Sequence, residues 1–152
     1  MEDLITSLEV ISLAGLLSGI LDLTATSTLV KTQGIPIERL LQTIASGALG
    51  PSAFREGKKT AAIGVFFHFF IAFSAALIYY TISRKMSALL DYPFFSGVVY
   101  GSAVHLVMSR IVVPSSAAPK REFSTKAFLS QLIIHIFCVG LPIALIVSHL
   151  SR

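Results

Sequence analysis

Four long apolar stretches, separated by short polar segments, constrain this chain more than any other feature. They cover residues 8–30, 60–83, 92–113 and 125–149. A helix needs about 20 apolar residues to cross the hydrocarbon core of a bilayer, and each stretch reaches that length. A closed β-barrel is the other solution in lipid, but runs such as 63–71 do not alternate as strands would. The stretches therefore predict an all-α membrane protein with four transmembrane helices in an up-down bundle.

The scarcity of charged residues favours the same class of protein. Asp, Glu, Lys and Arg make up 13% of the 152 residues, whereas about 25% is usual for a soluble domain. Hydrophobic residues make up 54%, and the mean hydropathy is +0.79. So few charges cannot cover a soluble globule of this size. The composition argues against a soluble enzyme, a coiled coil, a disordered chain and a nucleic-acid-binding module, and the length predicts one membrane domain over residues 1–152.

Residues 36–48 have the spacing of a short amphipathic helix. The apolar face carries Ile37, Leu40, Leu41, Ile44 and Ala48. The polar face carries Glu38, Arg39, Gln42, Thr43 and Ser46. The run is too short to cross a bilayer, so it predicts an interfacial helix that lies along the membrane surface.

Lys and Arg are distributed unevenly between the two ends of the predicted bundle. The side with loops 31–59 and 114–124 carries eight of them, namely Lys31, Arg39, Arg55, Lys58, Lys59, Lys120, Arg121 and Lys126. The opposite side carries three, namely Arg84, Lys85 and Arg152. Because cytoplasmic loops are enriched in Lys and Arg, the bias predicts cytoplasmic loops 31–59 and 114–124 and termini on the outer, periplasmic side.

Each apolar stretch contains one ionisable residue at a similar depth. These residues are Asp22, His68, His105 and His135. Each lies nine residues from a residue that marks the predicted cytoplasmic end of its helix, or about 13 Å at the helical rise. The four marking residues are Lys31, Lys59, Pro114 and Lys126. An antiparallel bundle brings all four to one layer near the bilayer centre. Ionisable side chains are costly there, so this layer is the candidate functional site.

Small and polar residues on the same helix faces predict that the four ionisable groups point into the bundle. The small residues expected at helix contacts are Gly15, Gly19, Gly64, Gly97 and Gly101. Gln131 and Cys138 share the face of His135, and Thr26 shares that of Asp22. Pro142 leaves the carbonyl of Cys138 without its usual donor, which fits either a kink that shapes a cavity beside His135 or ordinary packing.

This set of side chains suits several kinds of chemistry. Three neutral imidazoles and a carboxylate fit zinc, iron or another divalent metal. Two facing histidines fit haem, and a chain of Asp and His fits a proton relay or a polar ligand. The structural alternative is that the histidines are hydrogen-bonding groups between helices, and that Arg110 reaches inward to neutralise Asp22.

Three functions follow from these alternatives. The first is a membrane protein whose buried His/Asp site binds a metal, haem or small ligand, or relays protons or ions. The second is a non-catalytic accessory or scaffolding subunit, and the third is a small metal-dependent membrane enzyme that acts on lipid or quinone. The expected partners are the lipid bilayer and either a second copy or another membrane protein, with no nucleic acid.

Residues 61–113 carry a recognisable arrangement of glycine and histidine. Gly64-x-x-x-His68 followed by Ala72, and then Gly97-x-x-x-Gly101-x-x-x-His105, resemble the small bacterial inner-membrane family that includes YagU. The resemblance implies several membrane helices and the inner (plasma) membrane of a bacterium. It implies no reaction.

Overall fold

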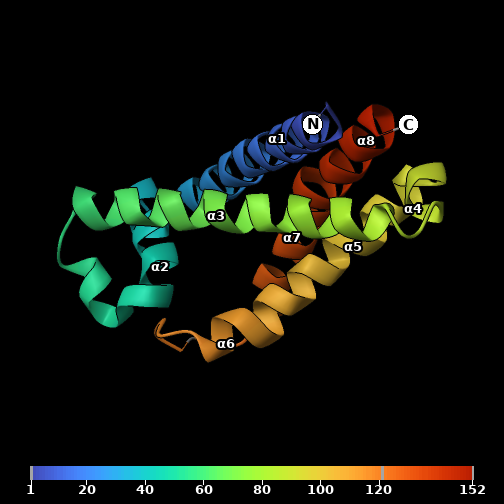
Figure 1. The fold of residues 1–152 in the computed structure, drawn as a ribbon. Helices are drawn as coiled ribbons and strands as arrows, with labels where there is room; N and C mark the ends of the chain where they lie inside the picture. Colours follow the sequence, from blue (N-terminus) through green and yellow to red (C-terminus); the bar gives the residue numbers. More distant parts are fainter. Residues whose placement is uncertain (1, 121, 152) are drawn as a thin grey trace.

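The computed structural model describes residues 2–120 and 122–151, and these residues form helices and connections without a β-strand (Figure 1). Four helices are long and apolar enough to cross a membrane, which confirms the number predicted from the sequence. They cover Ser7–Thr32, Lys58–Ser83, Pro93–Ser115 and Thr125–Leu150. Arg121 and Arg152, which belong to the uneven charge pattern, lie outside the described residues.

The first helix, α1 (Glu2–Thr32), is longer than the stretch predicted from the sequence. The Thr residues near its end do not stop it, because their hydroxyls donate to carbonyls within the helix. Thr28 donates to Thr24 at 2.8 Å and Thr32 donates to Leu29 at 2.7 Å. The chain leaves the helix at Gly34, whose φ of 76° suits a residue without a Cβ.

The third and fourth long helices each contain one widened, π-helical turn. The third consists of α5 (Pro93–Val107), a π turn (Met108–Val112) and α6 (Val113–Ser115). The fourth consists of α7 (Thr125–Ile134), a π turn (His135–Gly140) and α8 (Leu141–Leu150).

Both π turns end just before a proline. Val113 donates its N–H to Met108, five residues back, and the next residue is Pro114. Leu141 donates to Ile136 in the same way and precedes Pro142. Proline has no N–H and clashes with the carbonyl of a regular turn, and a π turn relieves both problems. For this reason Pro114 does not end the third helix at residue 113, where the sequence predicts its end.

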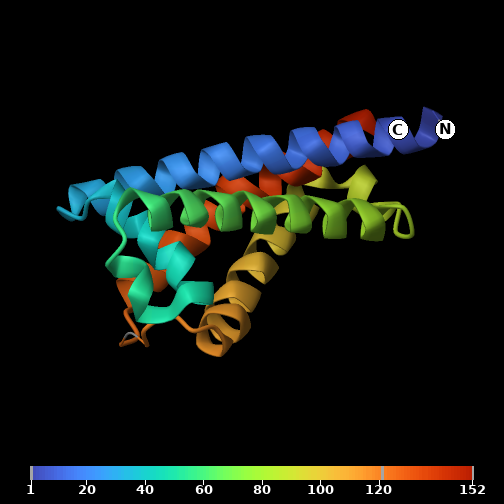
Figure 2. The ribbon, with the colours of Figure 1, turned by 60° about the vertical axis from the view of Figure 1, so that its left-hand side comes forward.

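The four long helices run in alternating directions, with both termini at one end of the molecule (Figures 1 and 2). The helix α3 (Lys58–Ser83) packs on α1, and the fourth helix packs on both α1 and α5. The buried core includes Val10, Tyr79 and Ile143, from three different helices. The short helix α4 (Ala88–Asp91) lies at the end of the molecule that contains the two termini. Toward the opposite end α5 and α6 diverge from α3 (Figures 1 and 2).

The amphipathic segment forms α2 (Ile37–Leu49), followed by a 3₁₀ turn (Gly50–Phe54). Its expected bounds are confirmed within one residue, but its most deeply buried residues do not belong to the expected apolar face. Gln42, Ala45 and Ser46 are buried, while Ile37 is exposed. The buried polar groups are accommodated because they bond to backbone, as Gln42 does when it donates to the carbonyl of Gly57 at 3.2 Å.

Glycines mark the closest helix crossings, as the sequence predicts. A methyl group on Gly140 would lie 2.5 Å from the backbone N of Gly101, and one on Gly97 would lie 2.9 Å from the Cα of Leu141. A methyl group on Gly101 would lie 2.6 Å from the carbonyl oxygen of His135. The backbones of α5 and the fourth helix therefore touch directly, which only glycine permits.

The other three predicted packing glycines lie at two further crossings. Gly15 and Gly19 of α1 face Phe73 and Phe69 of α3, and a methyl group on Gly19 would lie 2.8 Å from the Phe69 ring. A methyl group on Gly64 would lie 2.7 Å from the carbonyl carbon of Leu41. Gly64 therefore serves the contact of α3 with α2, and not a contact between two long helices.

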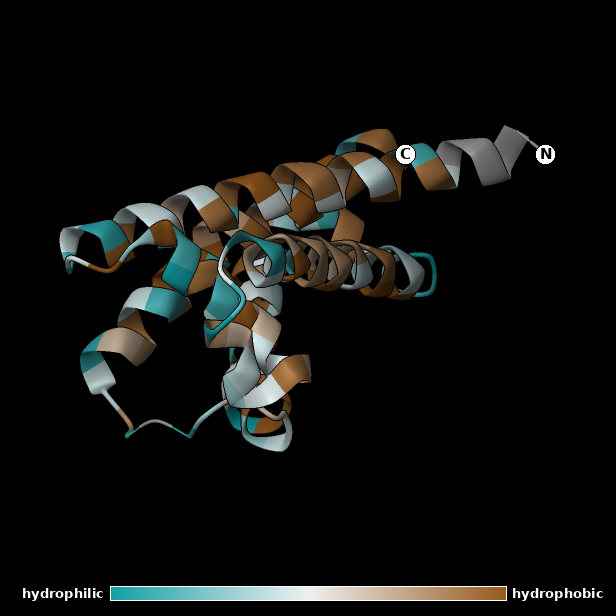
Figure 3. Cartoon of the chain, turned by 90° about the vertical axis from the view of Figure 1, so that its left-hand side faces the viewer, coloured by the Kyte–Doolittle hydropathy of each residue, from teal (hydrophilic) through white to brown (hydrophobic). Residues whose placement is uncertain are grey.

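Large apolar side chains cover the outer surface of the long helices. Phe66 and Phe70 of α3 and Phe94 and Phe95 of α5 are exposed, the last by 73% of its surface. Hydrophilic residues gather at the connections between the helices (Figure 3). The described surface is consistent with a multi-pass membrane protein.

Candidate functional site

A cavity of about 380 Å³, open on part of its surface, lies between the helices, with walls from all four long helices and from α2. The residues that line it are Ser18, Gly19, Asp22, Thr26, Leu40, Thr43, Ile44, His68, Ile71, Ala72, Ala75, Val104, Met108, Val113, Gln131, His135 and Val139. Three of the four predicted ionisable residues are in this set. The cavity has the size of many ligand sites and combines apolar walls with a few polar groups.

Asp22 of α1 and His68 of α3 form a pair on one wall of the cavity. The Nε2–H of His68 donates to the carbonyl oxygen of Gly19 at 2.8 Å, because a carbonyl can only accept. The ring is thereby oriented with its Nδ1 toward Asp22, at 3.9 Å from Oδ2. The two side chains are 14% and 12% exposed, so both are largely withdrawn from solvent. The pairing joins the two helices at the level where Gly19 lets them approach.

His135 faces the same cavity from the fourth helix. Its Nδ1–H donates to the carbonyl oxygen of Gln131, one turn earlier, at 2.8 Å. In the neutral ring this leaves the lone pair of Nε2 as an acceptor. His135 is the first residue of the π turn before Pro142, so the helix is widened beside His135.

Two polar atoms in the cavity wall have no hydrogen-bond partner among the described residues. They are Oδ1 of Asp22 and Oγ1 of Thr26, and both are buried. The two residues lie one turn apart on α1, on the face that lines the cavity. Buried polar atoms are nearly always satisfied, so two adjacent unpaired atoms at a cavity indicate a place for a polar ligand group or water.

His105 lies at the same level but outside the cavity lining. It is 4% exposed, its ring centroid lies 5.2 Å from that of His135, and Phe128 packs on it at 4.6 Å. Its Nε2 is buried without a partner among the described residues. The depth estimate from the sequence thus brings the four residues together, but His105 fills space behind His135 and does not face the cavity.

The four residues lie as two pairs, Asp22 with His68 and His105 with His135, whereas a single metal centre, one of the alternatives, requires them to converge. Across residues 2–120 and 122–151, no three His, Cys, Asp or Glu side chains are grouped closely enough to hold a metal ion. The rings of His105 and His135 contact each other, which leaves no space for a porphyrin between them. The physical reason is the glycine crossing of α5 with the fourth helix, which presses these two rings together.

Arg110 does not pair with Asp22, as the structural alternative required. Arg110 is exposed, and its guanidinium lies over the rings of Phe123 and Phe128, 5.3 and 5.4 Å from their centroids. Cys138 is partly buried and does not line the cavity, whereas Gln131 does.

The contribution of α2 to the cavity is what the sequence reasoning missed. Leu40, Thr43 and Ile44 of α2 line the cavity together with residues of the four long helices. Leu40 and Ile44 are one turn apart on the expected apolar face, so the sequence does contain a pattern that could have indicated this contact. Because the segment is too short to cross a bilayer, its apolar face alone predicts a helix on the membrane surface.

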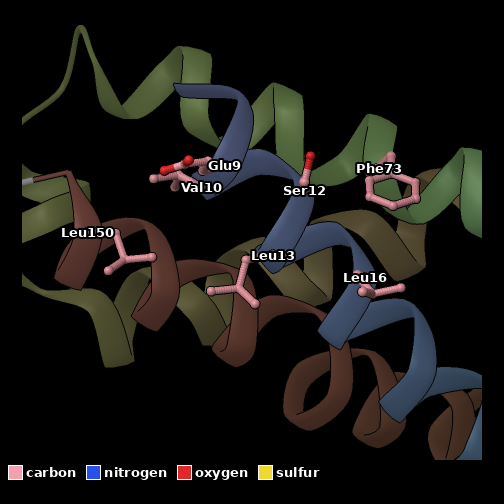
Figure 4. Close-up of a pocket in the computed structure, with 7 residues that line it drawn as sticks. All are labelled: Glu9, Val10, Ser12, Leu13, Leu16, Phe73 and Leu150. Atoms are coloured by element: carbon pink, nitrogen blue, oxygen red, sulfur yellow. The ribbon is translucent and has the colours of Figure 1, made fainter. Parts of the chain in front are cut away.

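A separate, larger space of about 560 Å³ lies on the outside of α1 near the termini. Figure 4 shows Glu9, Val10, Ser12, Leu13 and Leu16 on α1, with Phe73 of α3 and Leu150 of α8 beside them. Leu13 and Leu16 are exposed there. Since its polar groups do not converge, this surface groove is a weaker candidate site than the internal cavity.

No family model, no curated protein and no solved structure matches the chain. The resemblance of residues 61–113 to the YagU family therefore stays a prediction.

Proposed function

We propose that this chain is a four-helix membrane protein of the bacterial plasma membrane whose internal cavity binds a small organic ligand. The four long helices cross the bilayer in an up-down bundle, and α2 lies at the end predicted to be cytoplasmic. The observation that carries the proposal is the internal cavity, which is walled by all five of these elements and contains the Asp22–His68 pair and His135.

Two features of the cavity support ligand binding over a purely structural role for these residues. A structural pair is normally packed and fully hydrogen-bonded, whereas Oδ1 of Asp22 is buried without a hydrogen-bond partner among the described residues, and the Asp22 side chain lines a space of about 380 Å³. Apolar walls from Ile71, Ala72 and Val139 supply contact area for a ligand body. His105, by contrast, does not line the cavity and packs against Phe128, although its Nε2 is also without a partner among the described residues.

Cysteine labelling tests whether the cavity is accessible. Cys138 is the single cysteine, so Cys138→Ser provides a thiol-free background. Val139→Cys places a thiol in the cavity wall, and Val147→Cys places one in the packed core of the same helix. Both exchanges are nearly neutral in size, so Val147→Cys is a matched control.

The neutral reagent methyl methanethiosulfonate is applied to membrane vesicles that contain each variant. We expect the thiol at residue 139 to react faster than the thiol at residue 147, because only the former adjoins open space. Equal, slow reaction of the two thiols would show that the cavity admits no small molecule and would refute the proposed function.

A further inference from the structure

The charge of the cavity restricts the chemistry of what it can bind. Of the described residues that line it, only Asp22 carries a formal charge, and neither Lys nor Arg is among them. A carboxylate that is largely removed from water is costly unless a cation compensates it. Arg110, the nearest cation along the third helix that the sequence suggested, is directed to Phe123 and Phe128. The compensating cation must therefore come from a proton or from a ligand.

The geometry of the Asp22–His68 pair leaves room for such a group. The separation of 3.9 Å between Nδ1 and Oδ2 is too long for a direct hydrogen bond. It is short enough for one donor atom to contact both, since each N–H···O or N–H···N contact spans about 2.9 Å. The Nε2–H of His68 is already used by Gly19, so the neutral ring presents an acceptor to this point.

The other polar groups of the lining present several acceptors, although the amide of Gln131 and the hydroxyl of Thr26 can also donate. His135 uses its Nδ1–H on the carbonyl of Gln131 and presents Nε2 as an acceptor in the neutral ring. Oγ1 of Thr26 and Oδ1 of Asp22 are buried and unpaired. The polar side of the cavity thus offers carboxylate, imidazole and hydroxyl acceptors, and a group with several N–H donors and a positive charge complements it.

Much of the remaining lining of the cavity is apolar. Ile71, Ala75, Val104, Met108 and Val139 come from three helices and present carbon and sulfur surfaces. The volume of about 380 Å³ is far more than an inorganic ion requires. An ion alone would leave this apolar space filled with water, whereas a hydrocarbon body fills it favourably.

We propose that the ligand is a small organic cation, an alkylammonium head on a compact apolar body. The ammonium lies between Asp22 and His68, within reach of Thr26, and the apolar body lies against Ile71 and Val139. This inference rests on the proposed function, because it assigns a ligand class to the same cavity.

Two probes of the same shape separate a charge requirement from simple filling of the cavity. 1-Adamantylamine is protonated at neutral pH, as alkylamines are, and 1-adamantanol has the same body with a neutral head. Binding of each to the full chain in lipid nanodiscs is measured by isothermal titration calorimetry. Each probe is also tested for protection of the thiol in Val139→Cys, Cys138→Ser protein against methyl methanethiosulfonate.

Asp22→Asn removes the charge at nearly constant shape. Glu9→Gln is the matched control, since it removes one negative charge from the same helix on the outer groove shown in Figure 4. We expect the amine to bind the natural chain and Glu9→Gln alike. We expect the alcohol to bind much more weakly, and Asp22→Asn to weaken amine binding by about 30-fold or more. The comparison of the two probes on the natural chain needs no variant to fold.

Several results would overturn the inference. Equal binding of the amine and the alcohol, insensitive to Asp22→Asn, would leave a ligand cavity without a preference for cations. Sodium or potassium binding that depends on Asp22 and displaces the amine would assign the site to an inorganic ion. Failure of both probes to bind or to protect residue 139 would also refute the organic cation. The proposed function is judged separately, by the labelling rates of the thiols at residues 139 and 147.

Discussion

The crossing of α5 with the fourth helix allows a quantitative prediction for Gly140→Ala. The added methyl group would lie 2.6 Å from the Cα of Gly101 and 2.5 Å from its backbone N. Carbon atoms in contact normally lie about 3.5–4.0 Å apart, so the two helices must separate by about 1 Å. The obstructing atoms belong to backbone and cannot turn aside as a side chain would.

The expected cost follows from these distances. Overpacking a rigid contact costs about 3 kcal/mol at the upper end of its usual range, and replacing Gly by Ala within a helix returns about 1 kcal/mol. The net loss is about 2 kcal/mol, which lowers the ratio of folded to unfolded protein by about 30-fold. Because Gly101 lies against the carbonyl of His135, the contact between the rings of His105 and His135 should loosen as well.

The assay is reversible unfolding of the purified protein by sodium dodecyl sulfate in mixed micelles, followed by far-ultraviolet circular dichroism. Gly47→Ala of α2 is the control, since a methyl group there would meet nothing closer than Ser116 at 3.9 Å. The control should be as stable as the natural chain or more stable by up to about 1 kcal/mol. If Gly140→Ala unfolds at the same detergent fraction as Gly47→Ala, α5 and the fourth helix do not cross closely enough at Gly140 to exclude a methyl group.

Two further predictions use the same unfolding assay. Tyr79 is 1% exposed and donates to the carbonyl oxygen of Leu89 at 3.0 Å, so Tyr79→Phe should destabilise the chain by about 1 kcal/mol. If Tyr79→Phe is as stable as the natural chain, water donates to the carbonyl of Leu89 in place of the lost hydroxyl. His105→Leu removes a buried ring whose Nε2 is unpaired among the described residues, and should leave stability unchanged or raise it by about 1 kcal/mol. It should not alter amine binding, and a loss of binding would place His105 in the site after all.

Much of the helical architecture could be predicted from local patterns. The four apolar stretches and the α2 segment have nearly the expected bounds, because each depends on the residues within it. The continuation of the third helix through Pro114 could not be predicted from such local patterns. A proline usually ends or kinks a helix, and the π turn that tolerates it depends on packing around Met108–Val112.

The depth of the candidate site residues along their helices could be predicted from the sequence, but which residue contacts which could not. Equal spacing from the helix ends brought Asp22, His68 and His135 to one cavity, since helical rise per residue is nearly constant. Their division into pairs depends on how far each helix is rotated about its axis. The π turn at His135–Gly140 changes that rotation, and neither spacing nor composition reports it.

The sequence by itself determined the four long apolar helices, several of the glycines at which helices cross, and the similar depth of the ionisable residues. These follow from hydrophobicity, side-chain size and helical rise, which are properties of short segments. Only the tertiary structure decided that Asp22 pairs with His68 and not with Arg110, that His105 lies behind His135, and that α2 lines a cavity. Such pairings depend on the packing of all the helices at once, because each helix presents several faces and only its neighbours select which one points inward.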